Sequence, residues 1–156
     1  MREVKFRGLD VVRNQWVYGG YYKHLKRTPC PMGDKITEKD YKPLIINSGF
    51  SDWNMPKPLD AFEVHENTVG QYINLNDKNN KEIYEGDIVE YKNEKFLIKE
   101  ELGSYMLVRQ DISTDMYSTF NNCWNDEVYP ISQLYWEENC TERILPVEII
   151  DNIYNK

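Results

Sequence analysis

The chain has 156 residues and a net charge of −7, with 40% hydrophobic and 29% charged residues. These values are typical of one soluble globular domain, or of a small domain with an extension. No apolar run approaches the ~18 residues of a membrane-spanning helix, and no apolar segment follows the charged first ten residues, which argues against a signal peptide. The three cysteines have neither metal-ligand spacing nor a disulfide pattern, so we expect a cytoplasmic protein without a metal or other cofactor.

The charge is distributed unevenly along the chain. Residues 1–45 contain ten Lys/Arg and five Asp/Glu, whereas residues 46–156 contain nine and twenty-one. The acidic part would repel the phosphates of nucleic acids, so direct nucleic-acid binding is not expected of it. It favours either a cationic protein partner or a solvated acidic surface.

The first 65 residues predict a β-hairpin followed by an irregular arm. Apolar and polar residues alternate on both sides of a polar turn at residues 13–15, and Gly19-Gly20 indicates a bulge or a close backbone approach. Residues 24–66 hold five of the seven prolines, and only Leu44–Ile46 suggests a strand there. A segment of this length without periodicity is either functional or mobile.

Residues 66–156 predict a small β-barrel with a final strand. Short alternating strands recur every eight to ten residues between tight turns, as in SH3-like barrels. Pro130 can open a short helix, and the isoleucine-rich end favours a strand that joins the sheet. The expected fold is therefore mainly β with minor α: an SH3-like barrel or roll, an N-terminal hairpin and an irregular arm.

The segment "NDKNNKEIYEGD", residues 76–87, carries turn chemistry. Asn80 can take the left-handed conformation, and Gly86 is expected at a positive φ that a side chain would oppose. The carboxylate of Asp87 can accept hydrogen bonds from nearby backbone N–H groups. We interpret this motif as folding information rather than as a reactive site.

The stretch "GQYINLNDKNNKEIYEGDIVEY" resembles the YopX-like family of small proteins from phages and prophages of Gram-positive bacteria. The opening "MREVKFRGLD" and the closing "VEIIDNIY" are also similar, although Gly8-Leu9 replace a commoner Ala-Trp pair and Asn80 replaces a typical Gly. The resemblance does not extend to residues 24–62 or 111–140. It implies an SH3-type roll, a phage genome and a bacterial cytoplasm, with no catalytic residues and a loose link to DNA packaging. The residues that carry the central motif are Gly70, Gln71, Tyr72, Asp77, Asn80, Glu85, Gly86 and Asp87.

Catalytic motifs are missing from the sequence. There is no Gly-rich phosphate loop, no Gly-x-Ser-x-Gly elbow and no convincing Cys–His pair. If residues 85–87 were a strand, Glu85 and Asp87 would share one face and could hold a divalent cation, but no third ligand is evident. An enzyme is therefore not expected.

Two functions remain open. The first is a protein-interaction or assembly module that binds a host or phage protein, or a second copy of itself, with Trp53 and Trp124 as anchors; Trp53 buried against the barrel is the alternative. The second is an accessory factor in phage DNA metabolism or packaging. Its basic residues would be Lys23, Lys26, Arg27, Lys35, Lys39 and Lys42, with Tyr21, Tyr22 and Tyr41 as stacking groups.

Overall fold

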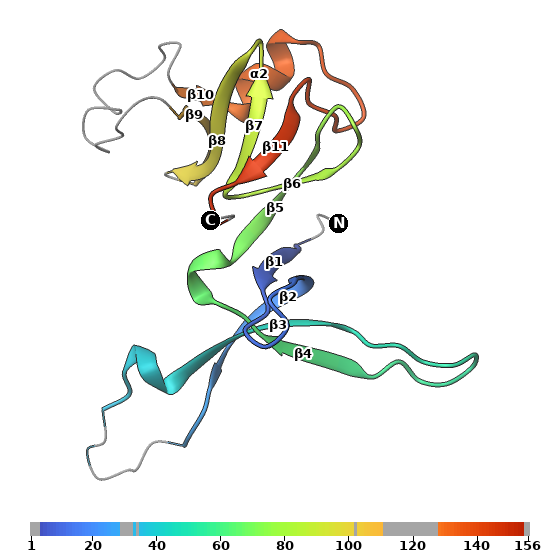
Figure 1. Cartoon of the computed structure of the whole chain (residues 1–156), viewed down its shortest axis with the longest axis vertical. Coiled ribbons are helices and arrows are strands. Elements are labelled where there is room, and N and C mark those ends of the chain that lie inside the picture. The colour runs from blue at the N-terminus through green and yellow to red at the C-terminus, as the bar shows by residue number, and fades with distance from the viewer. Residues whose placement is uncertain (1–3, 29–32, 34, 102, 111–127, 155–156) are drawn as a thin grey trace. The chain divides into compact units, whose positions relative to one another are not determined.

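The computed structural model describes residues 4–28, 33, 35–101, 103–110 and 128–154. The chain divides into two compact units, one of residues 3–71 and one of residues 72–156 with residues 1–2. The described part consists of antiparallel strands and one short α-helix (Figure 1), which confirms the prediction of a mainly β protein.

The N-terminal unit is an antiparallel sheet with the strand order β4-β3-β2-β1-β5, and two short 3₁₀ turns lie outside it. The predicted hairpin is confirmed as β1 and β2. Its connection is shaped by Asp10, whose carboxylate accepts the N–H groups of Val12 and Arg13 at 2.7 Å each, and by Asn14 at a φ of 53°. The strands are β1 (Phe6–Leu9), β2 (Trp16–Leu25), β3 (Tyr41–Ser48), β4 (Leu59–Glu63) and the start of β5 (Gly70–Asn76).

The prediction of an irregular arm over residues 24–62 is wrong for much of that segment. β3 pairs with β2 on one side and with β4 on the other, and the expected Leu44–Ile46 strand is the middle of β3. The full length of β3 was not predicted because it contains Pro43. A proline has no N–H for the hydrogen-bond ladder and is uncommon in the interior of a strand. Its carbonyl nevertheless accepts the N–H of Val64 at 3.1 Å, so the ladder continues through it.

The C-terminal unit contains the larger core. A five-stranded antiparallel sheet has the order β10-β9-β8-β7-β11, and the end of β5 pairs with β6 (Glu82–Tyr84). The remaining elements are β7 (Asp87–Tyr91), β8 (Glu94–Glu101), β9 (Ser104–Arg109), β10 (Val128–Pro130), α2 (Ile131–Glu137) and β11 (Glu148–Asn152). The helix that begins after Pro130 and the final strand were both predicted. The buried core cluster comprises Ile73, Ile83, Val89, Phe96, Ile98, Leu107, Ile131, Leu134, Leu145 and Val147.

No closed barrel is present in the part of the chain that the structure describes. The five-stranded sheet begins at β10 and ends at β11, and these two edge strands do not pair with each other. A barrel requires such pairing of its first and last strands. Instead, Ile131 and Leu134 of α2 belong to the core cluster, so a helix supplies part of the cover that barrel closure would provide.

Candidate interaction surface

The connection between β3 and β4 forms the tip of a hairpin, residues 49–58, which extends away from the sheet of its unit (Figure 1). At its base the N–H of Gly49 donates to the carbonyl of Pro58 at 2.8 Å. At its end the N–H of Met55 donates to the carbonyl of Asp52 at 3.1 Å, and Asn54 is left-handed at a φ of 64°. These bonds and turn residues shape the tip without any apolar core beneath it.

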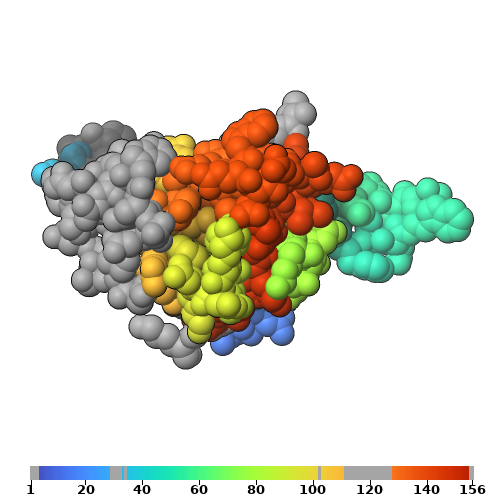
Figure 2. Space-filling view, turned by 90° about the horizontal axis from the view of Figure 1, so that it is seen from above, coloured from blue at the N-terminus to red at the C-terminus, as the bar shows by residue number. Residues whose placement is uncertain are grey.

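Large apolar side chains at this tip are exposed to solvent. Trp53 exposes 93% of its surface, Phe50 87% and Met55 64%, and Leu59 at the start of β4 exposes 77%. The same segment is drawn in teal in the space-filling view (Figure 2). Trp53 is thus not packed on a barrel. These four residues lie within ten positions of one another in the chain. Groups of exposed apolar side chains commonly mark a binding surface, and tryptophan is enriched among energetically dominant contacts.

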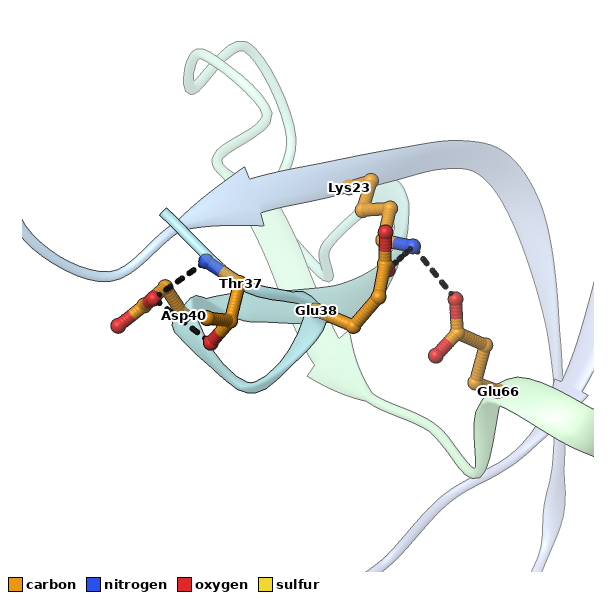
Figure 3. A network of polar contacts seen from close by, with 5 residues as sticks. All are labelled: Lys23, Thr37, Glu38, Asp40 and Glu66. Atoms are coloured by element: carbon orange, nitrogen blue, oxygen red, sulfur yellow. Dashed lines mark hydrogen bonds and ion pairs between the residues drawn. The ribbon is translucent and has the colours of Figure 1, made fainter. Parts of the chain in front are cut away.

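Three of the six basic residues considered for nucleic-acid binding, Lys23, Arg27 and Lys42, form ion pairs with carboxylates. Nζ of Lys23 lies 2.5 Å from Glu38 and 2.8 Å from Glu66, which joins β2 to both 3₁₀ turns (Figure 3). Hydrogen bonds to these two carboxylates raise the pKa of Lys23 above its usual value. Lys42 likewise pairs with Glu63 at 2.6 Å. The positive charge of these three residues is therefore balanced locally.

A further ion pair, between Arg27 and Asp40, lies in the same unit. Nε of Arg27 donates to Asp40 at 2.7 Å, and Asp40 also accepts the backbone N–H and the hydroxyl of Thr37 at 2.8 and 3.0 Å (Figure 3 shows the Thr37 contacts). The hydrogen bond from Arg27 is the main reason that the pKa of Asp40 lies well below its usual range. Residues 3–71 contain ten Lys/Arg and nine Asp/Glu, so this unit as a whole is nearly neutral.

The predicted turn chemistry of the central motif is confirmed. Asn80 has a φ of 61° and Gly86 a φ of 84°. The fully buried carboxylate of Asp77 accepts the N–H groups of Asn79 and Lys81 at 2.8 Å each, and Asp87 accepts the N–H of Tyr84 at 2.8 Å. These carboxylates are used to hold turns.

The other motif residues lie in strand pairs or in a turn. Gly70 and Gln71 pair with β1, and Tyr72 pairs with Tyr84 of β6, their ring centroids 5.6 Å apart. Glu85 lies in the turn between β6 and β7, so the strand geometry that would place it on one face with Asp87 is wrong. No group of three or more His, Cys, Asp or Glu residues that could hold a metal ion occurs among the described residues.

Sequence reasoning singled out Trp53 but missed its neighbours Phe50, Met55 and Leu59. The available signal was their occurrence among prolines and turn residues, where apolar side chains have no strand or helix period to bury them. Trp124, the second predicted anchor, lies outside the described residues.

No helix in the described ranges is long and apolar enough to span a membrane.

The chain was compared with family models and with curated proteins. The curated proteins include no match to the chain. The family model described as YopX protein matches residues 5–156, including the two segments in which the motif resemblance was not recognised. The chain therefore belongs to the YopX family.

Proposed function

We propose that this chain is a non-enzymatic protein-interaction module, encoded by a phage or prophage and active in the bacterial cytoplasm. It binds a host or phage protein, or a second copy of itself, through the tip of the β3–β4 hairpin. The exposure of Phe50, Trp53, Met55 and Leu59 at this tip is the observation that carries the proposal. A rigid scaffold that presents an irregular connection is a common arrangement in binding proteins.

The uneven distribution of buried apolar side chains supports the same proposal. Among the described residues, the C-terminal unit contains thirteen buried hydrophobic side chains, and the N-terminal unit contains only Ile45 and Val64. Burial of apolar surface contributes roughly 25 cal/mol per Å². A partner that covers the hairpin tip would therefore add stabilisation to the unit that has least of its own.

The ion pairs of the N-terminal unit weigh against the accessory factor that binds nucleic acid. Nucleic-acid binding requires Lys and Arg side chains that neutralise phosphates and so displace the counterions condensed on the nucleic acid. Lys23, Arg27 and Lys42 already contact carboxylates, and the unit has only one more cationic than anionic residue. Protein binding is the better-supported function.

The test compares two exposed tryptophans. Trp53→Ala removes the centre of the tip, and Trp136→Ala removes a side chain that is 77% exposed on α2 in the other unit. Self-association is measured by light scattering, and partner capture from phage-infected host cells by affinity purification and mass spectrometry. We expect Trp53→Ala to lose the association or the captured partner while Trp136→Ala keeps it, with both variants folded.

The proposal fails if the parent protein is monomeric and captures no partner reproducibly. It also fails if both tryptophan variants behave like the parent, because the hairpin tip would then contribute nothing to the interaction.

A further inference from the structure

The edge of β4 offers main-chain hydrogen-bonding groups that the sheet leaves open. Among the strands that the structure describes, β4 is terminal in its sheet and has β3 as its one neighbouring strand. The bonds from Val64 to Pro43 and from Gly49 to Pro58 identify the hydrogen-bonded positions of this antiparallel pair. Because such positions alternate along a strand, the N–H and C=O groups of Asp60 and Phe62 face β3, and those of Leu59 and Ala61 face outward.

The open part of this edge has a defined end. Beyond Ala61, the N–H of Val11 donates to the carbonyl of Glu63 at 2.9 Å, and Asp10 forms a bridge with Val64. The β1–β2 connection therefore covers the end of the strand. Leu59, Asp60 and Ala61 are all exposed. The nearest residues that could block the pairing of another strand, Lys57 and Pro58, precede β4 and are not part of it.

We propose, building on the proposed function, that an extended segment of a cationic protein partner adds to this edge as a further antiparallel strand. The charge of Asp60 selects the partner. Asp60 is exposed, and the ion pairs among the described residues do not include it. A Lys or Arg opposite Asp60 would therefore form a favourable cross-strand pair. The residues that flank this base lie beside Leu59 and Ala61, so the recognised pattern is apolar–basic–apolar.

A second copy of the chain is a poorer occupant of the same edge. Pairing β4 with its own copy so that Leu59 meets Ala61 places the two Asp60 side chains opposite each other, and directly opposed like charges are destabilising. Shifting the register so that Ala61 faces itself brings Leu59 against Glu63, whose carbonyl already accepts the N–H of Val11. A foreign strand with a central base avoids both conflicts.

The probe is a synthetic capped peptide of alternating valine and lysine, titrated into isotopically labelled full-length protein. We expect amide hydrogen exchange to slow at Leu59 and Ala61, whose N–H groups the peptide would bind, and to change little at Asp60 and Phe62. Replacing the lysines by glutamates should weaken binding about 1.4- to 5-fold, the range of cross-strand pair effects. Asp60→Lys should reverse this preference. N-methylation of the peptide valines should abolish the protection.

A variant that keeps the fold makes the test decisive. Ala61→Pro removes an N–H that faces outward, a change that an edge strand tolerates, and should eliminate peptide binding. Unchanged amide exchange at Leu59 and Ala61 in the parent at saturating peptide would overturn the inference. Self-association that Ala61→Pro abolishes would also overturn it, because the occupant would then be a second copy. If Trp53→Ala loses a partner that Ala61→Pro still captures, the proposed function stands and only the edge-strand inference fails.

Discussion

Gly86 and the ring of Tyr154 are in contact: a Cβ atom added to Gly86 would lie 2.8 Å from Cε2 of Tyr154. The carbonyl of Gly86 also accepts the N–H of Ile153 at 3.0 Å. The turn between β6 and β7 is therefore held against the C-terminal segment. Two features favour glycine at position 86: its φ of 84° is one that residues with a Cβ rarely adopt, and the ring of Tyr154 leaves little space for a Cβ.

Gly86→Val is expected to destabilise the protein by roughly 1–3 kcal/mol, because a β-branched residue strains the backbone at this φ and also meets Tyr154. Thermal or urea unfolding measures the change. Gly86→Ala and Gly103→Ala form a matched pair, since Gly103 has a φ of 78° with nothing within 4 Å of its added Cβ. Gly103→Ala should cost less than Gly86→Ala. Equal costs would show that the contact with Tyr154 is unimportant.

Gly19→Ala is expected to destabilise the N-terminal unit by about 1–3 kcal/mol through overpacking. The added Cβ would overlap the carbonyl oxygen of Ile46 on β3 and lie 2.9 Å from its carbonyl carbon. At Gly20, the next residue, the nearest atom would be 3.9 Å away. Gly20→Ala should therefore be neutral or stabilising by up to about 1 kcal/mol, because glycine is unfavourable inside a strand. Similar unfolding midpoints for the two variants would refute the predicted close approach.

Asp77→Ala is expected to be strongly destabilising, because the carboxylate of Asp77 is fully buried and holds three backbone groups. One oxygen accepts the N–H groups of Asn79 and Lys81, and the other accepts the N–H of Ile149 at 3.2 Å. Each buried donor left without a partner costs roughly 1–3 kcal/mol. Asp77→Asn keeps one carbonyl oxygen and should cost less. Asp52→Ala, at an exposed position, should stay within about 0.5 kcal/mol of the parent in denaturant melts.

Arg27→Met is expected to raise the pKa of Asp40 towards its ordinary value, because the hydrogen bond from Arg27 is the main cause of its lowered pKa. Since the pKa of Asp40 in the folded state lies below its value of about 3.9 in the unfolded state, this carboxylate stabilises the fold above that pH. The contribution is lost as the pH falls through the folded pKa. Titration of the Asp40 carboxyl carbon by NMR measures the shift. Lys26→Met removes a neighbouring cation that donates to the carbonyl of Lys39, and it should leave the Asp40 titration nearly unchanged.

The sequence alone determined features that depend on a few neighbouring residues. Local residue patterns predicted β1, β2, β5 to β9 and β11, but not β4 or most of β3, and Pro130 predicted the start of α2. The left-handed Asn80 and the positive φ of Gly86 were also predicted, because a residue's own side chain limits its backbone angles. Membership of the YopX family was recognisable from the same central motif.

Only the tertiary structure decided which distant segments meet. Asp77 bonds to Ile149, 72 residues away, and β3 continues through Pro43 because β2 and β4 pair on its two sides. The exposure of Trp53 and the open edge of β4 were likewise not encoded in a local pattern. The burial of a side chain and the pairing of a strand depend on which distant segments pack beside them. Residue periodicity shows which face of a strand is apolar, but not which segment covers that face.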